Sequence, residues 1–434
     1  MGKGVASLFL VSTRRWLNWI TDIARDRIIT YQIIAIVAVY GVVFRTLGLG
    51  RSLWLDEVWE ANAIIAPSLR IMFYHSSWLP TCPPLFLVLV RIMVEIFGLS
   101  NRVLRIIPSL MGLLSALAMV GLAARLLSKR FALLASAMFI FSPAATEFSR
   151  TLKQYSSELA VTTAILLLAI IYLEHATLRR FWMLTGMIVL GLLMAYSVAF
   201  LLPGIVLVVC FSPACSESSV AGWNGKHIKP FVRAFILATL SGGILIGEYL
   251  VFVWPNLADS SALRVIWATW TTTLNGTRGF ARAFVFRGYD LIRYLPLPGR
   301  LLERMTLVGA TVVLILLFGV VLAWRKYLRG NRIWLETQVI CLLPCLLLVI
   351  ADRFHWYPMV ERTGLFLLPC IIMLVASSLQ LTFDFIIESL RRDWLLPFRD
   401  VALVCVTLLV IWVGIHNSSL GPFEDVAGAV SFLR

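Results

Sequence analysis

The stretch PPLFLVLVRIMVEIFG, residues 83–98, decides the topology that the sequence predicts. It is apolar enough to enter a membrane, but it is shorter than the roughly 20 residues of a spanning helix and carries Arg91 and Glu95. If this stretch crossed the membrane, every later loop would lie on the opposite side. The rest of the prediction therefore depends on whether it crosses.

The loop cations favour a stretch that does not cross. In that case one side holds most of them, in the groups Arg125/Lys129/Arg130, Arg179/Arg180, Lys226/Lys229/Arg233, Arg325/Lys326/Arg329/Arg332 and Arg391/Arg392/Arg399. The two short loops of the other side hold only Arg150, Lys153, Arg353 and Arg362. Because cytoplasmic loops are enriched in Lys and Arg, we place the first side in the cytoplasm. Residues 83–98 are then predicted to form an interfacial or re-entrant helix on the outer face.

The composition indicates an all-α polytopic membrane protein. Hydrophobic residues make up 60% of the chain and charged residues only 14%, against roughly 25% charged residues in a soluble domain. We expect about eleven transmembrane helices, judged by apolar length, together with external juxtamembrane helices. The predicted spans are 28–48, 104–125, 131–148, 155–174, 181–195, 197–212, 231–253, 305–324, 334–351, 363–380 and 401–416.

This topology gives one transmembrane module over residues 1–416, with long external loops at about 49–103 and 254–304, and a short external tail at 417–434. The net charge of +15 follows in part from cytoplasmic cations that face anionic lipid, so it does not indicate a nucleic-acid partner. The seven cysteines are scattered without metal-ligand spacing and are predicted to be small buried side chains.

The stretch LWLDEVWEA, residues 53–61, places Asp56 and Glu57 between Trp54 and Trp59, just past the outer end of the first predicted span. Two acids beside hydrocarbon cost free energy unless they are paired or functional. They could also occupy the first turn of a helix, where its dipole favours negative charge. Further charged and polar residues fall on the same predicted side: Arg105, Glu147, Arg150, Lys153, Tyr155, Asp352, Arg353, His355, Tyr357, Glu361 and Arg362.

Carboxylates, arginines and aromatic rings at one boundary between water and lipid suit the transfer of a sugar from a lipid phosphate. A carboxylate can accept the proton of an acceptor hydroxyl as general base. Arginines can neutralise the leaving phosphate, and Trp or Tyr rings can stack on the sugar. Structural ion pairs between loops remain the alternative for any single residue.

Four stretches resemble the GT-C superfamily of polyprenyl-phosphate-sugar-dependent glycosyltransferases, in particular the branch that is similar to protein O-mannosyltransferases and aminoarabinose transferases. They are LWLDEVW (53–59), TCPPLFLVLVRIMVEIFGLSNRVLRIIPSLMGLL (81–114), RFALLASAMFIFSPAATEFSRTLKQYSSELA (130–160) and VERTGLFLLPCII (360–372). Two positions depart from the family pattern: Cys82 stands where a His precedes PPL, and Lys153 stands where many relatives have Arg.

The resemblance implies roles for individual residues. Asp56 matches the catalytic base and Glu57 its acidic neighbour. Arg105 is expected to bind the donor phosphate, helped by Arg150, Lys153 or Arg362. Substrate contacts are expected from Trp54, Trp59, His75, Glu147, Tyr155, His355 and Tyr357. The resemblance implies no cofactor and no metal ion.

We therefore expect a glycosyltransferase that moves one sugar, with inversion, from a polyprenyl-phosphate donor to a hydroxyl of a lipid, glycan or protein acceptor. It is expected in a bacterial cytoplasmic (inner) membrane, with its active site facing the periplasm or the exterior. Relatives carry a further external domain, so the part that recognises the acceptor is either absent here or supplied by the loop at 254–304. A transporter or flippase of lipid-linked glycans, or a non-catalytic membrane subunit, is the alternative.

Overall fold

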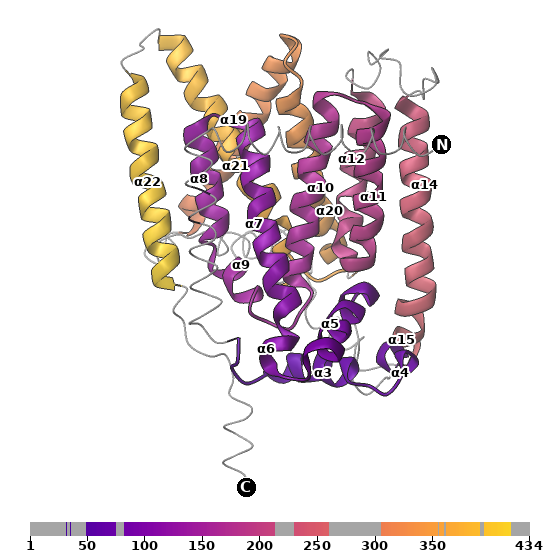
Figure 1. Ribbon diagram of the computed structural model, residues 1–434. Coiled ribbons are helices and arrows are strands. Elements are labelled where there is room, and N and C mark those ends of the chain that lie inside the picture. The colour runs from indigo at the N-terminus through magenta and orange to yellow at the C-terminus, as the bar shows by residue number, and fades with distance from the viewer. Residues whose placement is uncertain are drawn as a thin grey trace, which may run out of the picture.

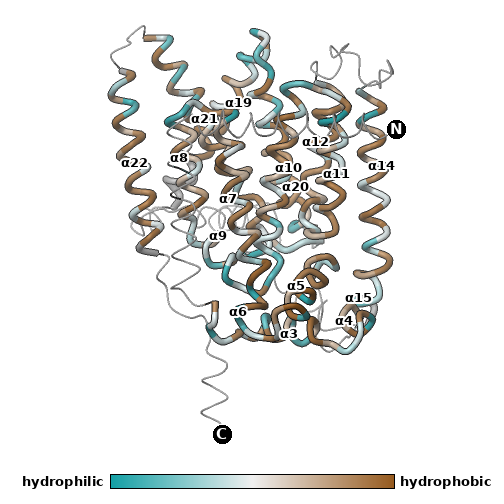
Figure 2. The backbone as a smooth tube through the Cα atoms, in the orientation of Figure 1, coloured by the Kyte–Doolittle hydropathy of each residue, from teal (hydrophilic) through white to brown (hydrophobic). Residues whose placement is uncertain are grey.

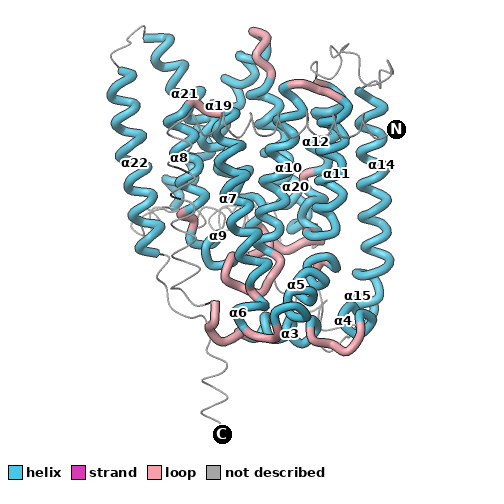
Figure 3. Tube along the Cα trace, viewed as in Figure 1, coloured by secondary structure: helices cyan, strands magenta, loops and turns pink. Residues whose placement is uncertain are grey.

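The computed structural model describes residues 32, 35, 49–74, 82–212, 230–259, 305–354, 356–359, 362–390 and 395–417. Within these ranges the chain is helical and contains no strand (Figure 3). The helices are α3 (Leu55–Ile64), α4 (Leu69–Tyr74), α5 (Pro84–Phe97), α6 (Asn101–Leu104), α7 (Ile106–Leu126), α8 (Lys129–Ile140), α9 (Pro143–Phe148), α10 (Tyr155–Glu174), α11 (Leu178–Met194), η2 (Tyr196–Phe200), α12 (Leu202–Phe211), α14 (Pro230–Glu248), η4 (Tyr249–Val253), α15 (Trp254–Asp259), α19 (Met305–Leu328), α20 (Ile333–Arg353), η5 (Leu365–Leu367), α21 (Leu368–Leu390) and α22 (Leu395–Asn417).

Six helical segments of the described ranges are long and apolar enough to span a membrane. They are Asn101–Leu126, Tyr155–Glu174, Pro230–Asn256, Ile333–Arg353, Leu365–Leu390 and Leu396–Ile415. Hydrophobic residues follow the length of the bundle and hydrophilic residues gather towards its two ends (Figure 2). The predicted class, a multi-pass all-α membrane protein, is confirmed. The predicted span at 28–48 lies almost entirely outside the described residues, and the count of about eleven is not established.

Residues 83–98 form α5, a helix of 14 residues that lies with α3, α4 and α6 at one end of the bundle (Figure 1). Pro84 occupies its first turn and Gly98, at φ 81°, follows its last residue. Both residues suit these positions, because proline needs no intrahelical partner there and glycine tolerates positive φ. Phe86, Leu87 and Val90 form the buried face of α5. The stretch therefore does not cross the bundle, as the distribution of loop cations predicted.

Loops of the bundle divide between its two ends as that topology requires. The connections before α10 and after α14 lie at the same end as α3–α6, which we call the site end (Figure 1). The connections between α7 and α8, α10 and α11, and α19 and α20 lie at the opposite end (Figure 1). These opposite loops are among those that the sequence predicted to be cytoplasmic.

The predicted span at 131–148 is wrong, because the helix breaks at Phe141–Ser142. α8 has 12 residues, about 18 Å of helix, which is less than a membrane core of about 30 Å. Pro143 opens α9, and the Ser142 hydroxyl accepts a hydrogen bond from the Ala145 amide at 3.3 Å. Gly414 of α22 lies so close to this corner that a Cβ there would stand 2.4 Å from the Phe141 carbonyl oxygen. The break directs α9 towards the site end.

α10 lies at the centre of the bundle, where it packs against α7, α11, α20 and α21. Its predicted bounds, 155–174, are those of the structure. The predicted division between 181–195 and 197–212 is also confirmed, since α11 ends at Met194 and η2 joins it to α12. A Cβ on Gly191 of α11 would lie 2.5 Å from Val161, so glycine permits the close contact between α11 and α10. The packing of α10 against these helices positions the loops at both of its ends.

Candidate active site

The first turn of α3 displays the adjacent acids. Trp54 precedes α3 in an extended conformation, and its amide donates to Glu57 Oε2 at 3.3 Å. A carboxylate that returns to the residue before a helix satisfies an amide that would otherwise lack a partner. The local explanation for two acids in a first turn therefore applies to Glu57. The side chain of Asp56 takes no part in this capping contact.

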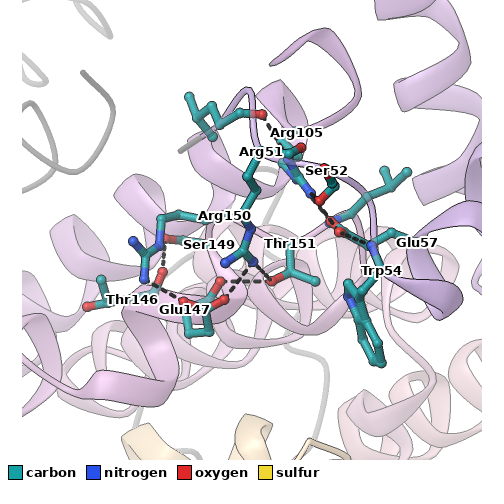
Figure 4. A network of polar contacts seen from close by, with 12 residues as sticks. Arg51, Ser52, Trp54, Glu57, Arg105, Thr146, Glu147, Ser149, Arg150 and Thr151 are labelled. Carbon is teal, nitrogen blue, oxygen red and sulfur yellow. Dashed lines mark hydrogen bonds and ion pairs between the residues drawn. The ribbon is translucent and has the colours of Figure 1, made fainter. Parts of the chain in front are cut away.

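Glu57 and Arg105 form a fully buried ion pair that joins the first external loop to α7 (Figure 4). Arg105 Nε lies 2.9 Å from Oε1 of Glu57 and Nη2 lies 2.6 Å from Oε2. The remaining N–H groups of Arg105 donate to the carbonyl oxygens of Leu49, Arg51 and Ser52, at 2.8–3.1 Å. All five guanidinium donors of Arg105 thus have protein acceptors.

This geometry does not fit the predicted role of Arg105 as the main phosphate ligand. A phosphate at Arg105 would have to displace a carboxylate or three carbonyl groups from a site without exposed surface. The same burial removes Glu57 from direct contact with a substrate, because both of its oxygens accept hydrogen bonds inside the protein. In this structure the pair joins the first external loop to the start of α7.

Glu57 also holds the loop between α9 and α10. The amide of Leu152 donates to Oε1 of Glu57 at 2.6 Å. One residue further on, Lys153 Nζ lies 2.6 Å from Oε1 of Glu60, and both side chains are buried. Burial lowers the pKa of Lys153, but Glu60, Cys82, Tyr155 and Asp56 together raise it, so the pKa lies above its ordinary value. Lys153 therefore remains charged, and its ion pair with Glu60 joins the loop before α10 to α3.

Cys82, which replaces the histidine of the family pattern, lies beside the same loop. Its thiol donates to the side-chain oxygen of Gln154 at 3.0 Å. Burial, together with the charge of Glu60, raises the pKa of Cys82 well above its ordinary value. Cys82 therefore stays a neutral thiol that links the start of α5 to the loop before α10.

Asp56 pairs with Arg362, which lies 306 residues away in the chain and precedes α21. Arg362 Nη1 donates to Oδ2 of Asp56, and the guanidinium carbon lies 5.9 Å from the centre of the Trp54 ring. The side chains of Asp56 and Arg362 are 18% and 21% exposed, in contrast to the wholly buried Glu57 and Arg105. Of the two adjacent acids, Asp56 is thus the one that a substrate can reach.

Arg51, Glu147 and Arg150 form a third group of charges (Figure 4). Arg51 Nη2 lies 2.6 Å from Oε1 of Glu147, and Arg150 Nη2 pairs with Oε2 of the same carboxylate. Arg51 Nη2 also donates to the Thr151 hydroxyl at 3.3 Å. The backbone carbonyl of Arg51 accepts from Arg105, so this group is joined to the buried pair.

Of the remaining predicted residues, Tyr155 lies near the charges of Lys153 and Arg362. Tyr155 is buried at the start of α10, and its ring packs edge-on against Phe148 at 5.0 Å. The ring of Tyr357 packs edge-on against Phe200 at 5.3 Å. Trp59 is half-buried on α3. His75 and His355 lie outside the described residues.

Two participants were not predicted from the sequence. Glu60 follows Glu57 by three residues, a spacing that places both side chains on one face of α3, so the helical periodicity could have revealed it. Arg51 lies in a loop without periodic signal, and only its contacts identify it. Among the described residues, no group of three or more His, Cys, Asp or Glu side chains is arranged to hold a metal ion.

Comparisons with known proteins show where this chain has relatives. Residues 81–241 match the family model of dolichyl-phosphate-mannose-protein mannosyltransferases. No curated protein matches the chain. Among solved structures, ArnT from Cupriavidus metallidurans in the apo state aligns with 18% identity and a TM-score of 0.49, over 81% of this chain and 60% of that one. ArnT bound to undecaprenyl phosphate aligns with 17% identity and a TM-score of 0.49 over the same shares.

The oligosaccharyltransferase from Archaeoglobus fulgidus, tethered with an acceptor peptide, aligns with 14% identity and a TM-score of 0.49, over 93% of this chain and 57% of that one. The chain thus spans about 60% of the length of the ArnT structures. The family match over residues 81–241 confirms the resemblance to the GT-C glycosyltransferases that the sequence motifs predicted.

Proposed function

We propose that this protein is a membrane glycosyltransferase that moves a sugar from a polyprenyl-phosphate donor to an acceptor hydroxyl at the site end of the bundle. The observation that carries this proposal is the partly exposed ion pair between Asp56 and Arg362, two residues that are 306 positions apart in the chain. The neighbouring acids Glu57 and Glu60 are buried and engaged with Arg105 and Lys153. Asp56 is therefore the carboxylate best placed to accept a proton from a substrate.

In the proposed reaction the acceptor oxygen attacks the anomeric carbon of the donor sugar. Its proton passes to Asp56, a new bond forms between this oxygen and the anomeric carbon, and the bond from that carbon to the phosphate oxygen breaks. The electron pair stays on the phosphate, which leaves as polyprenyl phosphate. A single displacement of this kind inverts the anomeric configuration. A general base contributes about 10²- to 10⁴-fold to such a step.

Arg362 has two functions in this scheme. Its ion pair with Asp56 fixes the direction of the carboxylate, and its stacking near Trp54 limits its own movement. Because Arg362 is itself partly exposed, it can also face the charge that develops on the phosphate. Glu57 and Arg105 act indirectly, since they hold α3 against α7 and thereby fix the position of Asp56.

A transporter or flippase of lipid-linked glycans is the alternative class. Transporters bind their substrates near the middle of the membrane, within interrupted spanning helices. Asp56, Glu57 and Glu60 belong to α3, which lies at one end of the bundle instead (Figure 1), and each of these acids forms an ion pair with a residue that comes later in the chain. This placement favours group transfer at a membrane face.

Cleavage of the donor separates the two classes. Vesicles that contain the full chain and a native membrane extract as acceptor source are incubated with a panel of radiolabelled polyprenyl-phosphate hexoses and pentoses. We expect free polyprenyl phosphate to accumulate with at least one donor, in proportion to the amount of protein, as judged by mass spectrometry. Vesicles without the protein are the control. Movement of label across the membrane on an intact donor, or no release with any of the donors, would contradict the proposal.

A further inference from the structure

The turn η2, between α11 and α12, lies inside the bundle and carries polar side chains. α12 has ten residues, about 15 Å of helix, and returns to the opposite end, so η2 lies short of the site end. α5 packs against α11 on the side of the site end (Figure 1), and the Tyr196 hydroxyl of η2 lies 3.5 Å from the Cys82 carbonyl oxygen just before α5. Irregular backbone at membrane depth occurs only where it is buried in protein or lines a polar cavity.

Glu158 of α10 is a buried carboxyl beside this turn that the proposed mechanism does not use. Glu158 is 2% exposed, and its Oε2 atom has no hydrogen-bond partner among the described residues. Ser197 of η2 lies close to this carboxyl, and Thr162 follows Glu158 by one turn on the same face of α10. The hydroxyl oxygens of Ser197 and Thr162 are also buried without a described partner. Such groups are rare in native proteins and mark places where a further polar group can bind.

A second buried carboxyl lies on α14, at the last residue before the π-helix η4. Glu248 is 5% exposed, although most of this spanning segment faces outwards. Neither of its oxygens has a hydrogen-bond partner within the described ranges. Glu248 lies within electrostatic range of the Tyr196 hydroxyl. Because π turns in α-helices frequently occur at functional sites, two acids near η2 call for a common explanation.

The chemistry of these side chains fits the hydroxyl groups of a neutral sugar. No described cation forms an ion pair with Glu158 or Glu248, and acids in spanning helices are costly unless they are paired or functional. The carboxyls accept hydrogen bonds, whereas the hydroxyls of Tyr196 and Ser197 both donate and accept. Sugar hydroxyls also do both. A phosphate would be repelled by the two acids, and an ammonium group could donate but not accept.

Tyr155 connects this place to the proposed base. It begins α10, three residues and thus about one helical turn before Glu158. Tyr155 lies near the charges of both Glu158 and Arg362, and Arg362 pairs with Asp56. Since α10 runs from the site end into the bundle, Glu158 lies one turn deeper than Tyr155. A sugar held at Asp56 would therefore have its ring beside Tyr155 and its outer hydroxyls towards Glu158.

We propose that Glu158, Glu248, Tyr196 and Ser197 form a subsite, which we call the η2 subsite, that binds hydroxyl groups of the transferred sugar and selects neutral sugars. The inference rests on the proposed function, because the sugar reaches the subsite as part of the donor. The carboxyls accept hydrogen bonds from the sugar, and the two hydroxyl side chains donate to it. No covalent bond forms or breaks in the η2 subsite.

The test compares the donor that the wild-type protein cleaves with its monodeoxy analogues, each of which lacks one ring hydroxyl. The full chain in vesicles is used, and kcat/KM is measured from the release of polyprenyl phosphate. We expect the wild type to cleave at least one analogue about tenfold or more less efficiently, because that analogue leaves a buried carboxyl without its partner.

Glu158→Gln keeps the size of the side chain and an accepting oxygen but removes the charge. For the parent donor it should lower kcat/KM about five- to tenfold, the difference between a charged and a neutral hydrogen-bond acceptor. For the analogue that lacks the bound hydroxyl the loss should be less than about twofold, because the interaction is already absent. The acceptor is the same throughout, so this dependence assigns the hydroxyl to the donor.

Glu336→Gln is the matched control. Glu336 is another buried carboxyl with an unpaired oxygen, but it lies at the opposite end of the bundle, where its other oxygen accepts from Ser212 at 2.6 Å. This variant should change kcat/KM by the same factor for every donor. An analogue with an amino group in place of the hydroxyl tests the ligand class. More efficient cleavage of this analogue than of the parent donor by the wild type would overturn the selection of neutral sugars.

Equal losses in Glu158→Gln for the parent donor and every monodeoxy analogue would overturn the proposal, because a purely structural role does not depend on the sugar. Should Glu158→Gln fail to fold, Glu248→Gln and Ser197→Ala repeat the comparison, and uniform losses in both would contradict the η2 subsite. The proposed function fails separately. A wild type that cleaves none of the donors removes the reaction and the subsite with it, whereas cleavage that depends on no ring hydroxyl removes only the subsite.

Discussion

Replacement of Asp56 by asparagine is expected to reduce turnover by about 10²- to 10⁴-fold, the range that a general base contributes. Asparagine retains an oxygen that can accept from Arg362, so the loop should keep its conformation. What it loses is the ability to take the proton of the acceptor hydroxyl. Turnover is measured as polyprenyl phosphate released per unit time, with the donor that the wild-type protein cleaves.

Two comparisons make this result specific. Asp56→Asn should unfold with nearly the free energy of the wild-type protein, because the asparagine oxygen can still accept from Arg362. Asp56→Glu keeps a carboxylate but moves it by one methylene, and a misplacement of about 1 Å can reduce the rate by about 10²-fold. Turnover of Asp56→Asn equal to that of the wild type would refute the role of Asp56 as base.

The second large effect concerns stability. Glu57→Gln and Arg105→Gln are each expected to lower the free energy of unfolding by about 3–5 kcal/mol, because each leaves an uncompensated charge in a fully buried place. Three backbone carbonyls would also lose their donors in Arg105→Gln. Denaturant titration of the purified protein in detergent, followed by tryptophan fluorescence, measures these losses.

The double variant and an exposed pair provide the controls. Glu57→Gln with Arg105→Gln should cost less than the sum of the single variants, since no lone charge remains. Glu95→Gln, which removes the exposed partner of the ion pair on α5, should change stability by less than about 1 kcal/mol. Losses at Glu57 and Arg105 that are as small as the loss at Glu95 would show that the buried pair does not hold α3 on α7.

The sequence predicted most of the described fold because length and charge decide it. The short apolar stretch at 83–98 and the loop cations were enough to place α5 at the end of the bundle. The break at Ser142–Pro143 was missed, although the residues after Phe141 are less apolar and Pro143 favours the start of a new helix. Gly414, which permits α22 to approach this corner, carries no local signal at all.

The sequence predicted which residues meet at the site better than it predicted which of them form ion pairs. Asp56, Glu57, Arg105 and Arg362 were expected at one place, and the structure pairs Asp56 with Arg362 and Glu57 with Arg105. Which arginine is buried depends on how α3 packs on α7, a tertiary contact that spacing does not encode. For this reason Arg105 was expected at the phosphate and Arg51 was overlooked, although the structure buries the first and leaves the second accessible.

The most direct test of the central claim is the position of an intact donor. Asp56→Asn, which is expected to bind but not to cleave, would be incubated with the donor that the wild type uses and examined by cryo-electron microscopy. One hydrogen bond of about 3 Å and one attack distance of about 3–3.5 Å separate a base from the carbon that its substrate attacks. By that sum we predict that the anomeric carbon lies within about 7 Å of residue 56. A donor bound at the opposite end of the bundle, or a sugar well beyond that distance, would contradict the account.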